Sequence, residues 1–554
     1  MRLAVDLTRC QGYGQCAFLA PDVFQMRGGE ALMEDPEPDD GQRELVIRAA
    51  AACPVQAIRV ENIGPVGGRT WKAAPRKTAT MPTVPAQRSA PDLLDAGLDD
   101  FRRTGRIVIV GASLAGLAAA AVMRREGFAG SVTLIGDEQY QPYDRPPLSK
   151  QALDGWISPD RTGLPGVGDL NARWLLGVPA IGLDLPAKQV RLADGSAVDF
   201  DRVLIATGTR ARPWANRAEA ALDGVFLLRT RDDATGLLRR LADRPKRVLV
   251  IGAGFTGSEV ASVCRERDLP VTVVERGSAP LEGALGGVIG AVAKDMHLDH
   301  GVDLRSGVTV VSLEGDGAGR LRRAHLSDGT SVDAEVAVVA LGAVRNTEWL
   351  RGSGLAVGLW GLACDAGCRA FDVNGVTTEH IFVAGDVARF PHPLYEYQFL
   401  ALEHWGNAVA QAEIAAHNMV SGPADRWPHL ATPVFWSVQF GTNIKSVGVP
   451  TFADEVMIAQ GSMSERRFVA AYGYRGRMIA AVAFDQAMWL PFYQKMIESA
   501  APFPPEFRAV DRPADQHRVP VGMPGPEIRN FQATVVVTGH DPSERQAELV
   551  YHDH

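Results

Sequence analysis

The sequence of 554 residues predicts a multidomain protein of mixed α/β and α+β class. The chain is too long for one domain. Two segments, beginning at Arg106 and Lys246, each run from an apolar strand through a glycine-rich loop into a helix and on to a second strand. After about Thr432 the pattern changes to the short strands "VFWSVQFG", "IKSVGV", "ERRFVAAYGY" and "RMIAAVAFD". We therefore expect two α/β units followed by a separate α+β domain.

The composition is that of an ordinary globular protein, with 46% apolar and 22% charged residues. A formal net charge of −8 gives no support for nucleic acid as a partner, because such proteins usually carry a basic face. Six cysteines in so long a chain do not make a disulfide framework. They favour a thiol-reducing cytoplasm, where clustered cysteines more often hold metal.

The sequence predicts neither a secretory signal nor a membrane partner. The N-terminus "MRLAVDLTRC" lacks an apolar core. The longest apolar run, residues 107–123, is short for a membrane span and contains Gly111, Ser113 and Gly116 near its start. A strand, a turn and a helix fit this run better, so we expect a cytoplasmic protein.

Residues 1–62 predict a small α+β unit with a cysteine loop. Strands "RLAVDL" and "AIRVE" flank the loop "TRCQGYGQC" and a helix "RELVIRAAAACP". Cys10 and Cys16 are separated by five residues, with Tyr13 midway, and Cys53 is followed by Pro54. Bacterial iron–sulfur sites begin with cysteines at two-residue intervals and end on a remote Cys-Pro, but here a tyrosine replaces the middle cysteine. Three unmetallated thiols are the alternative.

Two further segments read as irregular. Residues 63–104 mix proline, alanine, threonine and basic residues without an apolar period, which predicts a semi-extended linker. Residues 506–554 are rich in proline and charge apart from "ATVVVTGH", and the sequence assigns them no role.

The first glycine loop has the spacing of a dinucleotide fingerprint. In "RIVIVGASLAGLAAAAVM", Gly111, Ser113 and Gly116 follow a buried strand and open a helix. Small residues there let the backbone approach a pyrophosphate at the helix N-terminus. Asp137 ends the next strand, where a carboxylate can bind a ribose.

The second glycine loop matches the fingerprint more closely. Gly252, Gly254 and Gly257 follow a strand, and Glu275 ends the next one. A carboxylate there accepts hydrogen bonds from a free 2′-hydroxyl and repels a 2′-phosphate, so NADH is favoured over NADPH, although Arg276 weakens this preference. Two such loops predict two Rossmann-type domains and two dinucleotides.

A disulfide reductase is the natural competitor for a chain with two such loops. Its chemistry needs a redox cysteine pair soon after the first loop, and the sequence has no cysteine between Gly111 and Cys264. Cys364 and Cys368 fit neither the CxxC motif nor a zinc spacing. We expect these two thiols and Cys264 to be packed in the core.

From Arg106 to about Pro505 the chain resembles the FAD-dependent ferredoxin reductases of the putidaredoxin reductase type, which are also similar to apoptosis-inducing factor. The motifs that carry the resemblance are "GASLAG", "GDEQYQPYDRPPLSK", "IATGT", "GAGFTGSE", "ALGAVRN", "AGDVARF", "EHWGNA" and "FWSVQFG". It implies a glutathione-reductase-like fold, with an FAD domain at 105–223 and 347–430, an NAD domain at 224–346 and a C-terminal reductase domain at 431–505.

The resemblance also implies the site residues. The FAD positions are Gly111, Ser113, Ala115, Gly116, Asp137, Arg145, Lys150, Ala180, Thr207, Gly208, Arg229, Asp386 and Trp405. The NAD positions are Gly252, Gly254, Gly257, Glu259, Glu275, Gly342 and Glu403. Lys150 and Glu259 are expected to form an ion pair beside the flavin, with Trp405 and Trp436 near the same ring. Hydride passes directly from nicotinamide to flavin, so no general base is expected.

Residues 1–62 resemble the single-cluster ferredoxins that serve bacterial cytochromes P450. The resemblance implies a [3Fe–4S] cluster on Cys10, Cys16 and Cys53, with Tyr13 at the vacant corner; a [4Fe–4S] cluster with a non-cysteine fourth ligand is the alternative. The whole chain is then expected to be an NADH-dependent ferredoxin reductase with a fused ferredoxin. Its acceptor would be a cytochrome P450 or a Rieske-type oxygenase. The alternative is an NADH-sensing FAD protein with a binding or regulatory role.

Overall fold

The structure is a computed structural model of the chain. It describes residues 93–505 without interruption. Outside that span it describes residues 2–5, 16, 20, 23–27, 31–34, 38, 40–52, 58–61, 518–520, 533–538 and 546–551.

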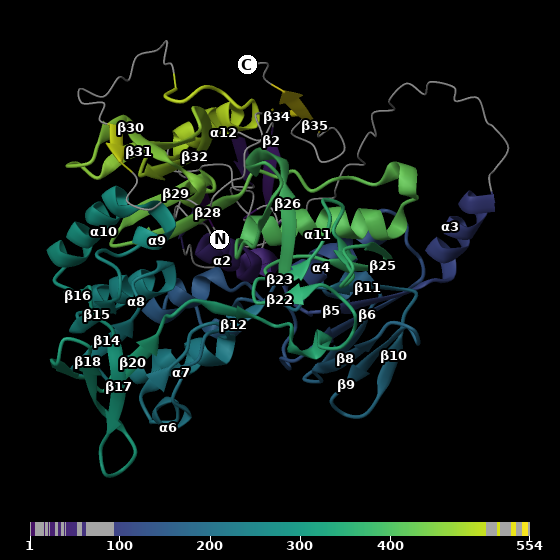
Figure 1. The fold of residues 1–554 in the computed structure, drawn as a ribbon. Helices are drawn as coiled ribbons and strands as arrows, with labels where there is room; N and C mark the ends of the chain where they lie inside the picture. Colours follow the sequence, from purple (N-terminus) through teal and green to yellow (C-terminus); the bar gives the residue numbers. More distant parts are fainter. Residues whose placement is uncertain are drawn as a thin grey trace.

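A six-stranded, mainly parallel sheet forms the first α/β unit (Figure 1). Its strands, in spatial order, are β24 (Arg369–Phe371), β25 (Thr377–Val383), β11 (Arg202–Ile205), β5 (Arg106–Val110), β6 (Ser131–Gly136) and β7 (Arg173–Leu176). Helices α4 (Leu114–Arg125) and α11 (Trp405–Val420) lie side by side over the sheet. Because β5 is buried and leads directly into the first glycine loop, the loop lies at the carboxyl edge of the sheet.

A five-stranded parallel sheet forms the second α/β unit. Its order is β13 (Val225–Phe226), β20 (Val336–Val339), β14 (Val248–Ile251), β15 (Val271–Glu275) and β16 (Asp303–Ser306). Its helices are α6 (Arg217–Ala220), α7 (Arg231–Ala242), α8 (Phe255–Glu266), α9 (Glu282–Leu285) and α10 (Gly287–Asp299). Helix α8 follows β14 through the second glycine loop, so the two predicted strand–loop–helix units are both confirmed.

Smaller sheets surround these units. They are β8 (Ala180–Asp184), β9 (Gln189–Leu192) and β10 (Ala197–Asp199); β12 (Thr209–Ala211) and β21 (Ala343–Arg345); β17 (Val310–Gly315), β18 (Leu321–Leu326) and β19 (Ser331–Asp333); and β22 (Val357–Gly358), β23 (Gly361–Ala363), β26 (Ala388–His392) and β27 (Gln398–Leu400).

The C-terminal unit is a sheet covered by α12 (Leu490–Glu498). Its strands, in order, are β28 (Val434–Gln439), β29 (Thr442–Gly448), β32 (Arg477–Phe484), β31 (Arg467–Tyr474), β30 (Glu455–Ser462) and β33 (Arg518–Pro520). Four of these strands were predicted; β30 was not, and β33 lies beyond the predicted end at residue 505. A further hairpin joins β34 (Ala533–Thr538) to β35 (Gln546–Tyr551).

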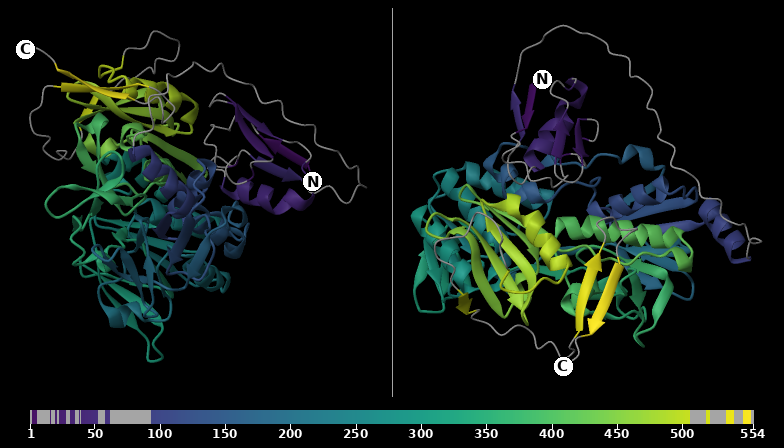
Figure 2. Two further views of the ribbon diagram at one scale, coloured as in Figure 1. Left: turned by 90° about the vertical axis from the view of Figure 1, so that its right-hand side faces the viewer. Right: turned by 90° about the horizontal axis from the view of Figure 1, so that it is seen from above.

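The described N-terminal elements form a separate group on one side of the molecule, drawn in purple in Figure 2. Strand β1 (Arg2–Val5) pairs antiparallel with β4 (Ile58–Glu61), and β2 (Phe24–Arg27) pairs with β3 (Ala31–Glu34). Helix α2 (Arg43–Ala52) lies against β4. The predicted terminal strands and helix are therefore confirmed.

The predicted linker is wrong over its last part, because residues Leu93–Thr104 form helix α3. The ring of Phe101 lies 5.5 Å from that of Phe128, and the guanidinium of Arg202 lies 4.1 Å from the Phe101 ring centroid. Leu94, Leu98 and Phe101 recur at helical spacing, a pattern that the linker prediction overlooked, and these tertiary contacts stabilise the helix. Residues 63–92 of the predicted linker lie outside the described residues.

The three thiols expected in the core are buried. Cys264, Cys364 and Cys368 are at most 1% exposed, and burial raises the pKa of the Cys264 thiol to about 12. They form no disulfide, so the described part of the chain gives no support for a redox pair at these positions. None of the described helices combines the length and the apolar character needed to cross a bilayer.

Tyr395 connects the first α/β unit to the C-terminal sheet. It ends the short 3-10 helix η6 (Pro393–Tyr395) and is 2% exposed. Its hydroxyl donates to the carbonyl oxygen of Ile479 (3.1 Å) and accepts from the backbone N–H of Val449 (2.8 Å). Both backbone groups lie in or beside the C-terminal sheet, so one phenol satisfies two buried polar groups there.

We expect Tyr395→Phe to lower the free energy of unfolding by about 1–3 kcal/mol, because it leaves a buried N–H and a buried carbonyl without their partner. Denaturant unfolding, followed by the fluorescence of the C-terminal tryptophans, measures this loss of stability. The matched control is Tyr397→Phe, since Tyr397 is 45% exposed. Equal stability of both variants would contradict the prediction.

Candidate functional site

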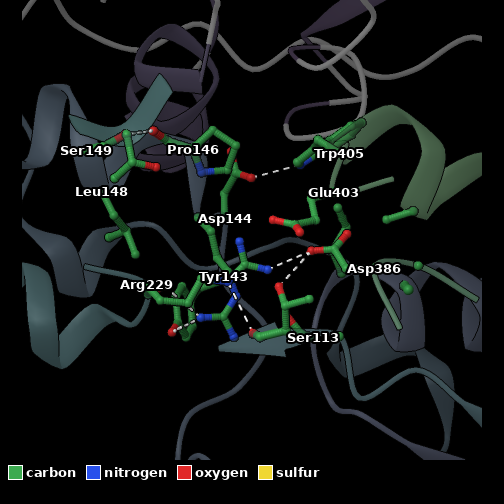
Figure 3. A pocket seen from close by; sticks show the side chains of 18 of the residues that line it. Ser113, Tyr143, Asp144, Pro146, Leu148, Ser149, Arg229, Asp386, Glu403 and Trp405 are labelled. Carbon is green, nitrogen blue, oxygen red and sulfur yellow. Dashed lines mark hydrogen bonds and ion pairs between the residues drawn. The ribbon is translucent and has the colours of Figure 1, made fainter. Parts of the chain in front are cut away.

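A pocket opens at the carboxyl edge of the first sheet (Figure 3). Its walls come from the first glycine loop, the segment 143–150, the loop 206–209 and the segments around Asp386 and Trp405. Thr256 and Glu259 of α8 complete it, so the pocket lies between the two α/β units.

The first glycine loop forms a tight turn that only small residues allow. Gly111 has a φ of +125°, and a Cβ there would overlap the carbonyl oxygen of Ala206. A Cβ on Gly116 would overlap the carbonyl oxygen of Gly111. The turn therefore brings the N-terminus of α4, with Ser113 and Ala115, to the pocket wall. Backbone N–H groups at a helix N-terminus suit the pyrophosphate of FAD.

Two ion pairs hold the wall on the side of β11. Arg229 lies 2.7 Å from Asp386, whose carboxylate also accepts from the Thr209 hydroxyl at 3.2 Å. Arg145 pairs with Glu138 at 2.5 Å, and the hydroxyl of Tyr143 donates to the same carboxylate. Pairing keeps these half-buried charges in fixed positions around a polar ligand.

Asp144 and Trp405 are joined by a hydrogen bond in the wall of the pocket, as Figure 3 shows. The indole Nε1–H of Trp405 donates to Asp144 Oδ1 at 2.9 Å, and the Trp405 ring lies 6.3 Å from that of Trp436. Asp144 is 3% exposed. Burial raises the pKa of its carboxyl to about 6, against the opposing effects of Trp405 and Lys150.

Glu259 is the buried carboxylate at the other end of the pocket. Lys150 Nζ lies 2.8 Å from Glu259 Oε2, which confirms that the predicted ion pair forms in the fold. The Ser149 hydroxyl donates to the same oxygen at 2.5 Å. The Ser437 hydroxyl of β28 donates to Oε1 at 2.6 Å and accepts from Gln439 at 3.0 Å.

The second glycine loop has one glycine that the protein itself does not require. A Cβ on Gly257 would overlap the carbonyl oxygen of Gly252, and Gly252 has a φ of +100°. A Cβ on Gly254, by contrast, would meet nothing within 4 Å. Gly254 is exposed. A glycine facing open space fits a loop approached closely by the pyrophosphate of a dinucleotide.

Glu275 is held rigidly at the end of β15. Its carboxylate accepts from the backbone N–H of Ala253 and of Gly277, each at 2.7 Å. Remaining lone pairs of both oxygens stay available to a ribose. Gly342 lies in a left-handed turn with a φ of +83°.

Glu403 lines the main pocket from the side of β21. Its carboxylate lies 3.0 Å from Arg345, and its pKa is raised by burial, which Arg345 opposes. His404, next to it, is half-buried, and loss of hydration lowers its pKa to about 4, so its imidazole is neutral at pH 7. The pocket therefore carries paired charges and no protonated histidine at this edge.

The structure brings together most of the residues predicted for FAD. Those that line the pocket are Ser113, Ala115, Arg145, Lys150, Thr207, Gly208, Arg229, Asp386 and Trp405, joined by Glu259 and Glu403 from the predicted NAD set. Gly111 and Gly116 shape the turn beneath it, whereas Asp137 and Ala180 do not line the pocket.

Among the site residues that sequence reasoning missed are Glu138, Asp144, Ser149 and Ser437. Three of them lie inside or beside the quoted motif "GDEQYQPYDRPPLSK", where the polar spacing was the available signal. Nothing in the sequence places Ser437, 178 positions away, against Glu259.

Of the three predicted cluster ligands, the structure describes Cys16. It is helical and 7% exposed, and its carbonyl oxygen accepts from the Ala20 N–H at 2.8 Å. Cys10, Tyr13 and Cys53 lie outside the described residues. A buried cysteine thiolate suits an iron–sulfur cluster, so the described part of the donor set fits the predicted group.

Three protein-family models match the chain. The model for pyridine nucleotide-disulphide oxidoreductases matches residues 105–412, and the model for the reductase C-terminal domain matches residues 434–517. The model for a 4Fe-4S single cluster domain matches residues 3–60. The three cysteines predicted as ligands all lie within this last match.

Individual proteins agree with these models. The probable ferredoxin reductase CtmF of Castellaniella defragrans is 33% identical over 408 residues, which cover 71% of this chain and 93% of the relative. Rhodocoxin reductase of Rhodococcus erythropolis is 33% identical, covering 72% and 91%.

Among solved structures, the covalent putidaredoxin reductase–putidaredoxin complex matches with a TM-score of 0.67 and 29% identity, covering 72% of this chain and 94% of the matched chain. The pocket between two dinucleotide loops and these matches lead to one conclusion. The chain belongs to the pyridine nucleotide-disulphide oxidoreductase family and, within it, to the FAD-dependent ferredoxin reductases, with an iron–sulfur ferredoxin domain at its N-terminus.

Proposed function

We propose that the chain carries electrons from NADH through FAD to a cluster in its own N-terminal domain, and from there to a cytochrome P450 or another oxygenase. The observation that carries the proposal is the meeting of the FAD loop and the Lys150–Glu259 pair in one pocket, in a chain that also has a cluster domain. FAD, when bound, accepts a hydride from nicotinamide and releases electrons singly. If NADH-dependent cytochrome c reduction persists without the cluster, the alternative of an NADH-sensing flavoprotein is favoured.

The proposed roles of the pocket residues follow from their contacts. Lys150 places its ammonium group in the pocket wall, and the ion pair with Glu259 holds that group in position. Asp144 fixes the indole of Trp405 through its Nε1–H, which keeps the Trp405 ring at one face of the pocket. Arg229 and Asp386 orient the polar part of FAD.

The cluster type is proposed from the ligand count. Three cysteines, Cys10, Cys16 and Cys53, supply three thiolates within residues 1–62. A cubane held by three thiolates has one iron without a cysteine ligand, so we propose a [3Fe–4S] cluster. Iron and sulfide analysis with EPR on protein purified with and without air distinguishes it from [4Fe–4S].

We expect Cys16→Ser to lower the iron content and to reduce NADH-dependent cytochrome c reduction to the rate of the flavin alone, because one of three thiolates is lost. NADH should still bleach the flavin absorbance. The control is Cys264→Ala, a buried thiol outside the N-terminal domain, which should keep its iron. Full cytochrome c activity of iron-depleted Cys16→Ser would exclude the cluster from the pathway.

We expect Glu275→Ala to lower kcat/KM for NADH by about tenfold or more, because hydrogen bonds to a charged acceptor contribute about 1.5–3 kcal/mol. The kcat/KM for NADPH should fall less, because the substitution also removes a carboxylate that repels the 2′-phosphate. Steady-state kinetics with both nucleotides measure the ratio. Asp295→Ala, at an exposed carboxylate of α10 in the same unit, is the control. Equal losses with both nucleotides would mean that Glu275 only holds the loop.

We expect the stability difference between the wild type and Asp144→Asn to depend on pH. The Asp144 pKa of about 6 lies above its unfolded value, so its protonation stabilises the fold fully below about pH 4 and this contribution is lost as the pH rises through 6. The raised pKa corresponds to at most about 3 kcal/mol.

Melting temperatures of the flavin-loaded proteins between pH 4.5 and 7.5 test this. The wild type should lose stability relative to Asp144→Asn as the pH rises. Asp154→Asn, at an exposed carboxylate, is the control. A constant difference across the range would show that Asp144 does not titrate there.

A further inference from the structure

Helix α2 of the N-terminal domain has apolar residues that pack against two hydrophobic clusters. Val46, Ala49 and Ala50, at helical spacing, are buried in a cluster that includes residues of their own domain and of the first α/β unit, and α2 lies against β4. Ile47 lies beside Ala50, three positions away on the helix, and contacts the second cluster. The buried members of this second cluster all lie between Val108 and Phe503, that is, outside the N-terminal domain.

The surface that α2 meets is η2, the single 3-10 turn Pro146–Ser149. Leu148 of this turn is 2% exposed and belongs to the cluster that Ile47 contacts. The inner side of the same turn faces the flavin pocket, since Pro146, Leu148 and Ser149 line it. In Figure 3 the purple helix of the N-terminal domain lies behind Ser149 and Pro146. One turn of chain therefore separates α2 from the pocket.

Helix α2 and turn η2 each end directly before a residue of one of the two proposed redox sites. The residue after α2 is Cys53, a predicted cluster ligand. The residue after η2 is Lys150, which pairs with Glu259 in the pocket. A contact between α2 and η2 thus lies between the two sites that must exchange electrons.

We propose that α2 and η2 form an intramolecular docking surface that seats the cluster domain against the outer side of the flavin pocket, with Ile47 as its apolar anchor. This inference rests on the proposed function and names the surface through which it operates. A contact made by one helical face is small, but a covalent tether raises the effective concentration of the domain enough for a small surface to hold it. An apolar anchor also makes the docking insensitive to salt, unlike a charged one.

The kinetic test uses Ile47→Asp in the full chain. NADH should reduce the flavin at the wild-type rate in stopped-flow absorbance, whereas reduction of the cluster, followed by rapid-freeze EPR, should slow by about tenfold or more, because a charge cannot replace the apolar anchor. Ile47→Leu should retain the wild-type rate. Leu359→Asp, at a side chain that is 93% exposed, is the control for adding a charge elsewhere.

A structural test is independent of activity. A photo-reactive benzoylphenylalanine placed at position 47 should, on illumination, form an intramolecular cross-link to the peptide that contains residues 146–149. Cross-links confined to other parts of the reductase, or unchanged cluster reduction in Ile47→Asp with full iron content, would overturn the docking surface. If the wild-type cluster is not reduced by NADH at all, the proposed function fails, while the cross-link still decides whether the surface exists.

Discussion

The arrangement of the site depends on one buried negative charge, the carboxylate of Glu259. It is 5% exposed, and a carboxylate so far from water is costly unless it is paired and hydrogen-bonded. Its partners come from two separate parts of the chain: Lys150 and Ser149 from the turn before α5 (Gln151–Asp154), and Ser437 from β28. Glu259 itself belongs to α8. Because each partner satisfies part of the same charge, the two α/β units and the C-terminal sheet are held in one relative position around the pocket.

The two glycine loops show how the same motif meets two different demands. Gly111, Gly116, Gly252 and Gly257 are required by the protein itself, since a Cβ at any of them would overlap a backbone atom. Gly254 is not, because the space in front of it is open. The first loop has Ser113 at the equivalent position, and its side chain reaches the pocket. The two loops thus share glycines at the positions that turn the chain. They differ at the position that a ligand would approach, which is Ser113 in the first loop and Gly254 in the second.

Much of this organisation could be predicted from local sequence, and the exceptions share a cause. The strand–glycine–helix units and the Lys150–Glu259 pair followed from motifs and from the resemblance that they carried. Ser437 was missed because its role depends on a contact with α8, and nothing in "FWSVQF" indicates that contact. Helix α3 was missed although Leu94, Leu98 and Phe101 recur at helical spacing, because one short amphipathic stretch is marginal by itself and depends on contacts with Phe128 and Arg202. In each case a distant contact decides what the local sequence leaves open.

The turn η2 contacts both the pocket and the N-terminal domain. On its inner side Ser149 donates to Glu259, and on its outer side the turn meets α2. Pro146 and Pro147 restrict the backbone of the turn. The turn therefore keeps α2 at a fixed position relative to the pocket. The proposed transfer of electrons from the pocket to the N-terminal domain and on to another protein requires a surface that the domain can leave. One apolar anchor on a rigid turn, supported by a tether, meets that need better than an extensive interface, because tight binding would slow release.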